Sequence, residues 1–371
     1  MRTVVSIIGT RPEAIKMAPV IRELRRHPSR IRSIVVSTGQ HREMLAQALA
    51  VFAIAPDLDL NLMQPDQTLA KLTAALFEAL DRTFGELQPD WVLAQGDTTT
   101  VMVAAIVSHY RRIRFGHIEA GLRSHDKWRP SPEELNRRVA DIVADAYFAP
   151  TARAAATLLA EGCAADAIFM TGNTVIDALL AVARQPFDWT TLALPPFPPA
   201  ARLVLITAHR RESFGPPFRD VCEAIRELAT DPAHQDVHFI YPVHLNPNVR
   251  APVAEILSSC PRVHLIEPVD YVAMAHLMKR AALVLTDSGG VQEEAPTFGV
   301  PVLVMRGTTE RPEGIDAGVA RLVGTDRATI VAESRRALAG ASGLACRPGA
   351  SPYGDGHAAE RIVEVLLRNP A

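Results

Sequence analysis

Short polar clusters recur along the chain, each at the end of an apolar, strand-like run. Three stand in the first half, and they read Gly9-Thr10-Arg11-Pro12-Glu13, Gln95-Gly96-Asp97-Thr98-Thr99-Thr100 and His117-Ile118-Glu119-Ala120-Gly121. Three more stand in the second half, and they read Thr207-Ala208-His209-Arg210-Arg211-Glu212, His244-Leu245-Asn246-Pro247 and Thr286-Asp287-Ser288-Gly289-Gly290. Ligands of open parallel sheets bind beyond the carboxyl ends of the strands, where loops and helix N-termini meet. The clusters therefore predict one ligand site, to which two lobes contribute.

The first and last clusters have the composition of an anion site. Gly9-Thr10-Arg11-Pro12 opens a helix, so Arg11 and Lys16 stand near a positive helix end that favours an anionic ligand. In the second half, Gly289 and Gly290 let the backbone of another helix start approach a diphosphate closely. Glu294, one turn further on, is placed to accept hydrogen bonds from ribose hydroxyls.

Acidic residues follow two strands of the first half. Asp97 precedes three threonines, and Glu119 comes two residues after His117. Each alone also fits a structural role, Asp97 as a helix N-cap and Glu119 as a solvated loop acid. The threonines can cap the helix equally well, which leaves Asp97 for a ligand. Two acids at adjacent strand ends, with Glu133 and Glu134 shortly after, favour acid–base chemistry.

Cations follow the strands of the second half. His209 is trailed by Arg210 and Arg211, and Arg311 lies beyond a later strand. A lone histidine is usually structural, but His209 stands at a strand end that is expected to face a ligand. The twelve histidines show no paired metal spacing, and no GxGxxG follows a strand. Neither a metal nor a dinucleotide cofactor is therefore expected.

Composition narrows the class of protein. The chain has 371 residues, of which 48% are hydrophobic and 22% charged, and this balance predicts two soluble domains. The formal charge of −2 argues against a general nucleic-acid or polybasic membrane surface. No apolar stretch reaches the length of a membrane span, and the first apolar run is better explained as a strand than as a signal peptide. The four cysteines lie far apart, so a reducing cytoplasm is expected.

Strand and helix patterns alternate throughout, which predicts an α/β protein with two Rossmann-like domains built on parallel sheets. The predicted strands are residues 4–8, 31–37, 91–94, 114–117 and 146–149, and then 203–207, 238–242, 263–266, 283–286 and 302–305. Predicted helices include 18–26, 69–86, 291–294 and 357–367. The domains are expected at 1–184 and 202–351, joined by a proline-rich linker at 185–201. The carboxyl-terminal helix, within 352–371, is expected to cross back to the first domain.

Taken together, these clusters resemble the non-hydrolysing UDP-N-acetylglucosamine 2-epimerases. The resemblance extends through Pro132-Glu133-Glu134-Leu135-Asn136-Arg137 and Val291-Gln292-Glu293-Glu294-Ala295-Pro296, and it covers nearly the whole chain in family order. It implies a glycosyltransferase-B-like architecture with a central cleft, a homodimer, and neither metal nor NAD. It also implies interconversion of UDP-GlcNAc and UDP-ManNAc by elimination and re-addition of UDP through a 2-acetamidoglucal.

The resemblance also implies roles for individual residues. Asp97, Glu119 and Glu133 match the acids that transfer the carbon-2 proton and steady the sugar, and Glu294 matches the ribose contact. The residues that match the diphosphate contacts are Arg11, Lys16, His209, Ser288, Gly289, Gly290 and Arg311. Met274 stands where the family commonly has an aromatic residue, and its flexible thioether can still pack on uracil.

Many bacterial members of the family are activated by a second UDP-GlcNAc. Four residues here match parts of that pocket, namely Gln40, His41, Arg210 and His244. Glu43 and Asp66 depart from the pattern, and two carboxylates facing a diphosphate would repel it, so weak or absent activation is expected. The alternatives left open are a glycosyltransferase of the same fold, a nucleotide-sugar binding module, and an epimerase of a related sugar such as a UDP-diacetamido-uronate.

Overall fold

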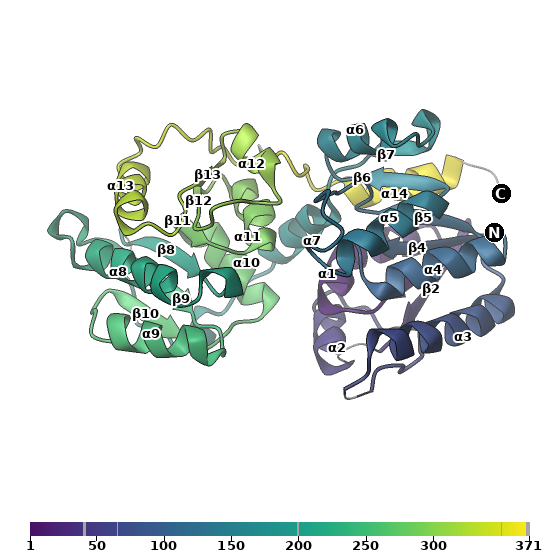
Figure 1. The fold of residues 1–371 in the computed structure, drawn as a ribbon, viewed down its shortest axis with the longest axis horizontal. Coiled ribbons are helices and arrows are strands. Elements are labelled where there is room, and N and C mark those ends of the chain that lie inside the picture. Colours follow the sequence, from purple (N-terminus) through teal and green to yellow (C-terminus); the bar gives the residue numbers. More distant parts are fainter. Residues whose placement is uncertain (40–41, 65, 199, 350, 369–371) are drawn as a thin grey trace. The chain divides into compact units, whose positions relative to one another are not determined.

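The computed structural model of the chain describes residues 1–39, 42–64, 66–198, 200–349 and 351–368. The chain divides into two compact units, Met1–Leu180 with Tyr353–Ala371 and Ala181–Pro352. Each unit is an open, wholly parallel β-sheet with helices packed against it (Figure 1). The predicted α/β class, with two Rossmann-like domains built on parallel sheets, is confirmed.

The sheet of the first unit has the strand order β3-β2-β1-β4-β5-β6-β7. Its strands are β1 (Arg2–Ile8), β2 (Ile31–Ser37), β3 (Leu58–Asp59), β4 (Trp91–Gln95), β5 (Arg114–Ile118), β6 (Ala146–Ala149) and β7 (Ile168–Met170). Its helices are α1 (Arg11–Arg25), α2 (Arg42–Val51), α3 (Leu69–Leu87), α4 (Thr99–Tyr110), α5 (Glu133–Val143), α6 (Ala152–Ala160), α14 (Ala358–Arg368) and most of α7 (Thr174–Ala183). The order reverses between β1 and β4, so the loops after these two strands flank a topological switch point.

The sheet of the second unit has the strand order β10-β9-β8-β11-β12-β13. Its strands are β8 (Arg202–Thr207), β9 (Val237–Pro242), β10 (Val263–Ile266), β11 (Ala281–Thr286), β12 (Val302–Val304) and β13 (Ala320–Leu322). Its α-helices are α8 (Pro216–Thr230), α9 (Pro247–Leu257), α10 (Tyr271–Arg280), α11 (Gly289–Glu294), α12 (Pro312–Asp316) and α13 (Arg327–Leu338). Here the order reverses between β8 and β11, and this second switch point lies beside the His209 and Asp287 loops.

Continuous apolar runs explain why these segments form central strands. Val4 and Val5 of β1 and Val204 and Ile206 of β8 are fully buried, as strands covered by helices on both faces must be. The predicted strands 31–37, 146–149 and 263–266 match the structure at both ends, and the others agree within two residues.

Three strands were not predicted from the sequence, namely β3, β7 and β13. Each has only two or three residues, and most of those residues are partly or fully exposed, so no buried apolar run marks them.

The predicted helix range 18–26 begins too late, whereas the helix start predicted at Gly9-Thr10-Arg11-Pro12 is confirmed. Helix α1 begins at Arg11, where Thr10 and Glu13 form a capping box, and Pro19 lies inside it. The division between the units falls between Leu180 and Ala181, and residues 185–198 belong to the second unit. There Phe187 stacks on the His276 ring, with the ring centroids 4.8 Å apart. Within the described residues, no helix is both long and apolar enough to cross a bilayer.

A buried carboxylate fastens the carboxyl-terminal helix to the first unit. Asp177 of α7 accepts the backbone N–H groups of Ala358 at 3.2 Å and Ala359 at 2.9 Å, which are orphan donors at the start of α14. Burial raises the pKa of Asp177 from 3.8 to about 6, although these hydrogen bonds oppose the shift. Because the native pKa lies above the unfolded value, the folded state gains stability from this group as the pH falls through 6.

Replacing Asp177 by asparagine should therefore remove a pH-dependent part of the stability. Between pH 7.5 and pH 5, the stability of the native protein relative to Asp177→Asn should rise by about 1.5 kcal/mol, measured by urea denaturation at fixed pH. Asp355 supplies a control, since its hydrogen bond with Arg361 lowers its pKa to about 2. Asp355→Asn should differ from the native protein by a constant amount over this range. A constant difference for Asp177→Asn as well would contradict the prediction.

Candidate functional site

The loops after β1 and β4 are joined by one buried carboxylate. Glu13 accepts the N–H groups of Gly9 at 2.6 Å and Thr10 at 2.7 Å, and it also accepts the Thr98 hydroxyl at 2.6 Å. Burial raises the pKa of Glu13, and these hydrogen bonds partly offset the rise. The loop that carries Arg11 is thus fixed against the loop that carries Asp97.

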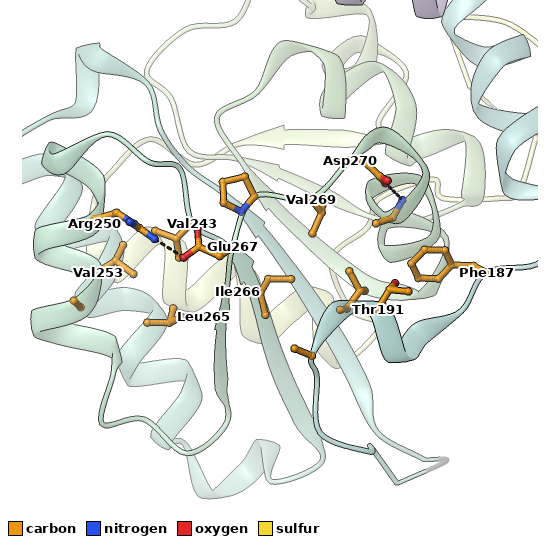
Figure 2. Close-up of a pocket in the computed structure, with 15 residues that line it drawn as sticks. Phe187, Thr191, Val243, Arg250, Val253, Leu265, Ile266, Glu267, Val269 and Asp270 are labelled. Atoms are coloured by element: carbon orange, nitrogen blue, oxygen red, sulfur yellow. Dashed lines mark hydrogen bonds and ion pairs between the residues drawn. The ribbon is translucent and has the colours of Figure 1, made fainter. Parts of the chain in front are cut away.

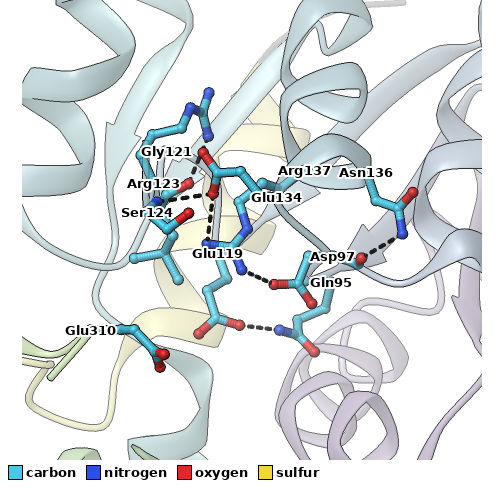
Figure 3. A network of polar contacts seen from close by, with 12 residues as sticks. Gln95, Asp97, Glu119, Gly121, Arg123, Ser124, Glu134, Asn136, Arg137 and Glu310 are labelled. Atoms are coloured by element: carbon cyan, nitrogen blue, oxygen red, sulfur yellow. Dashed lines mark hydrogen bonds and ion pairs between the residues drawn. The ribbon is translucent and has the colours of Figure 1, made fainter. Parts of the chain in front are cut away.

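Glu119 lies in a strained turn at the end of β5. Its φ of 68° is in the left-handed region, which a residue with a side chain adopts only when its surroundings hold it there. Lys16 contacts both carboxylate oxygens, at 2.7 and 2.8 Å, and Asn173 donates to one of them at 3.2 Å. Gln95 is the third residue that donates to this carboxylate, as Figure 3 shows. Lys16, predicted at a diphosphate, is therefore paired with Glu119 in this structure.

Asp97 is held by two residues of α5. The Arg137 guanidinium pairs with the Asp97 carboxylate, and Asn136 donates to the Asp97 carbonyl at 2.9 Å (Figure 3). Thr98, not Asp97, caps α4, as the sequence allowed. The side chain of Asp97 is 31% exposed, so a ligand can reach it.

The two glutamates that open α5 differ. The carboxylate of Glu134 is fully buried and accepts the N–H groups of Ser124 at 2.9 Å and His125 at 3.3 Å. Glu133 is half-buried, and its side chain makes no hydrogen bond with the part of the chain that the structure describes. Glu134 therefore serves the loop, and Glu133 is the one available to a ligand.

A buried imidazole braces the same strand ends. His117 Nδ1 lies 2.5 Å from Asp141, and its Nε2 lies 2.7 Å from the Gly96 carbonyl. Burial alone would lower the pKa of His117, but the charge and hydrogen bond of Asp141 raise it above its ordinary value. Arg123, at 2.7 Å, and the Gly121 N–H contact the other Asp141 oxygen. A carbonyl can only accept, so Nε2 donates to Gly96, and the raised pKa favours a second proton on Nδ1 facing Asp141.

In the second unit, the loops after β8 and β11 are joined in a similar way. One oxygen of Asp287 accepts the N–H groups of His209 at 2.6 Å and Arg210 at 2.7 Å. The His209 ring stacks on the His244 ring, with the centroids 5.3 Å apart and the planes inclined by 16°. Two residues predicted for the regulatory pocket, Arg210 and His244, thus lie beside His209.

The glycine-rich start of α11 leaves open space. A Cβ added to Gly290 would meet no atom within 4 Å, and one added to Gly289 would meet only Arg210, at 3.8 Å. The surrounding protein therefore does not require glycine at either position, whereas a closely approaching ligand would. At the other end of α11, Glu294 accepts the Tyr271 hydroxyl at 2.9 Å.

The remaining predicted residues have varied surroundings. Arg311 is ion-paired with Glu293, the neighbour of Glu294. Met274, one turn after Tyr271 in α10, is partly buried. Asp66 is exposed, with a positive φ of 56°. Gln40 and His41 lie outside the described residues, as does the side chain of Glu43, so the second-ligand site stays a prediction.

A cavity of about 880 Å³ opens at the carboxyl end of β10, the edge strand of the second sheet (Figure 2). Its walls are mainly apolar and include Val243, Leu265 and Ile266, while Arg250 and Glu267 form an ion pair there. None of the predicted site residues is among the described residues that line it. Sequence motifs gave no signal for this cavity.

Two doubly wound parallel sheets, one with ion-paired acids and the other with a glycine-rich helix start beside His209, define an α/β enzyme of the glycosyltransferase-B-like class. The sequence model of one family, described as UDP-N-acetylglucosamine 2-epimerase, matches residues 22–367. The chain belongs to this family of isomerases, and the predicted resemblance is confirmed.

Named relatives and solved structures agree with this placement. The UDP-N-acetylglucosamine 2-epimerase of Escherichia coli strain K12 is 48% identical, over 99% of this chain and 98% of that protein. The Neisseria meningitidis UDP-GlcNAc 2-epimerase, solved bound to UDP-GlcNAc, is 43% identical with a TM-score of 0.87, covering 99% of this chain and 100% of that one. The Methanocaldococcus jannaschii enzyme, in complex with UDP-GlcNAc and UDP, is 32% identical with a TM-score of 0.77, over 99% and 100% of the two chains.

The Glu13 bridge yields a stability prediction. Glu13→Ala would leave the buried Gly9 and Thr10 N–H groups without a partner, so it should destabilise the protein by at least about 2 kcal/mol in urea denaturation. Glu23 is a matched control on the same helix, where it pairs with Arg26 and His27 near the surface. Glu23→Ala should cost less than about 1 kcal/mol. Equal losses for the two variants would show that Glu13 is not a structural tie.

Proposed function

We propose that the chain is a non-hydrolysing UDP-N-acetylglucosamine 2-epimerase, which interconverts UDP-GlcNAc and UDP-ManNAc. UDP is eliminated to leave 2-acetamidoglucal and is then added back, without a metal or NAD. Family membership and the UDP-GlcNAc complex of the relative support the substrate. The observation that carries the chemistry is the pair of acids, Asp97 and Glu119, at the ends of adjacent strands, each held by a cation.

The ion pairs of this site suggest how the acids are used. A carboxylate that is paired with a cation is a poor proton acceptor, since taking up a proton would break the pair. A diphosphate would compete with Glu119 for Lys16, and its arrival would leave Glu119 freer to accept the carbon-2 proton. Asp97, Glu119 and Glu133 are the proposed acid–base groups, with Asp97 and Glu119 also contacting the sugar.

Leaving-group stabilisation is the second requirement. Carbon-2 protons are weakly acidic, so a base alone is insufficient, and charge that develops on the departing UDP must be neutralised. Arg11, Lys16, His209, Arg311 and the helix start at Ser288, Gly289 and Gly290 are proposed to hold the diphosphate. Glu294 is proposed to hold the ribose, and Met274 to pack on uracil. The active form is proposed to be a cytoplasmic homodimer, as the family resemblance implies.

Solvent exchange tests the reaction. Pure protein incubated with UDP-GlcNAc in deuterated water, with no acceptor, should yield UDP-ManNAc, and both recovered sugars should carry deuterium at carbon 2. The carboxylate that removes the carbon-2 proton exchanges it for a deuteron from the solvent before carbon 2 is protonated again. Proton NMR of the mixture reads both outcomes. Retention of the original hydrogen in both sugars would exclude elimination, and turnover of only another UDP-sugar would move the assignment to a related epimerase.

Charge-removing variants test the acids. Asp97→Asn and Glu119→Gln should each lower kcat by at least about 100-fold, since the shape stays but the base is lost. UDP affinity, measured by calorimetry, should change by less than about threefold in Asp97→Asn and should not fall in Glu119→Gln, because loss of that charge leaves Lys16 to the diphosphate. Asp90, at the opposite end of β4, is the matched control because its carboxylate accepts the Thr3 N–H at 2.7 Å. Asp90→Asn should keep native kcat. Normal turnover in either acid variant would remove that acid from the mechanism.

A further inference from the structure

Asp287, at the end of β11, has one unsatisfied oxygen. The residue is only 2% exposed, and its Oδ2 accepts the two N–H groups of the β8 loop. Its Oδ1 is buried and has no hydrogen-bond partner among the described residues. Leaving a buried carboxylate oxygen unsatisfied is costly, so such an atom in a native protein calls for a donor.

The His209 ring supplies a candidate donor. Its Nδ1 lies 3.6 Å from Asp287 Oδ1, within the range of an ion pair but too long for a hydrogen bond. The His209 side chain is 38% exposed, so its ring is open to solvent and to a ligand. With Nδ1 facing Asp287, Nε2 is the ring nitrogen left for that ligand.

Opposing effects act on the pKa of His209. Burial lowers the pKa of His209, the Asp287 carboxylate opposes this, and His244 and Arg210 lower the pKa further. His244 packs face to face on the ring, and Arg210 follows it in the same loop. The net direction is downward, which favours the neutral form of the ring in the free protein. The Asp287 carboxylate raises the pKa of His209, and an anion bound at Nε2 would raise it further and favour the protonated ring.

We propose that Asp287 is a positioning residue for His209, which takes up a solvent proton when the diphosphate binds and then donates Nδ1–H to Asp287 Oδ1. The proposal rests on the proposed function, because it takes the ligand to be a nucleoside-diphosphate sugar. Nε2–H and the positive charge of the ring then face the phosphate that leaves with the broken carbon–oxygen bond. Asp287 fixes the ring orientation and stabilises the imidazolium, which is the role an aspartate has beside a catalytic histidine.

Asp287→Asn separates this role from loop support. The asparagine carbonyl can still accept the His209 and Arg210 N–H groups, but its amide nitrogen can only donate towards Nδ1. The pKa of His209 in the UDP complex, followed by NMR of protein labelled at histidine Cε1, should fall by at least about one pH unit. His209→Gln identifies the signal among the twelve histidines. At pH 8, kcat should fall about tenfold or more while KM changes less than about threefold.

Tyr241→Phe is the matched control for the loop. The Tyr241 hydroxyl donates to the carbonyl of Ala208, the residue before His209, at 2.7 Å and does not touch the Asp287 carboxylate. This variant should leave the His209 pKa and kcat unchanged. Asp287→Asn should also have no further effect on kcat in a His209→Gln background, because Asp287 acts through that ring.

Two results would overturn the proposal. One is an unchanged His209 pKa in Asp287→Asn, and the other is an equal loss of kcat from Asp287→Asn with and without His209. If Asp287→Asn does not fold, the proposal can be tested with the ¹⁵N chemical shifts of His209 in the native UDP complex at pH 7. A His209 Nδ1 that carries no proton would contradict the hydrogen bond from Nδ1–H to Asp287 Oδ1. The pKa and the shifts need only bound UDP, so absence of epimerase turnover would refute the proposed function without deciding this point.

Discussion

Buried carboxylates that accept backbone N–H groups are the interactions on which the strand-end loops of each unit depend. Glu13 binds the loop after β1 and reaches Thr98 beyond β4, while Asp287, beyond β11, binds the loop after β8. In each unit the carboxylate joins the two strands at which the sheet order reverses. Where the strand order reverses, the connections after the two neighbouring strands diverge and leave a gap between their loops. A carboxylate that accepts several N–H groups ties the two loops together across this gap.

This construction explains how cations and acids share a small space. Glu119 is paired with Lys16 and Asp97 with Arg137, so the negative charge of each of these two acids is compensated by a cation. The strained φ of Glu119 is held by bonds from Gln95 and Asn173 as well as Lys16. Preorganised pairs of this kind can exchange partners when an anionic ligand arrives, with little movement of the backbone.

The central strands and the residues that follow them could be predicted from the sequence, because each has a signal in its own segment. Central strands are continuous apolar runs, and Asp97, Glu119 and His209 directly follow them. Partners that come from distant segments have no such signal. Asn173 and Asp141 lie 54 and 24 residues from the side chains they hold, and only the folded sheet brings them there. The start of α1 also has a local signal, since Gly9-Thr10-Arg11-Pro12 indicates it and Thr10 forms a capping box with Glu13, although the predicted range 18–26 began too late.

The return of α14 to the first unit has a consequence for biosynthesis. Ile362, Val363 and Leu366 of this helix are buried, and the helix packs against α1, which carries Lys16. A ribosome releases these residues only after the whole second unit has been made. Part of the apolar surface of the first unit therefore stays uncovered until the second unit and α14 have been translated. A nascent chain of this protein would need a chaperone on that surface longer than a protein whose domains are each made of one continuous segment.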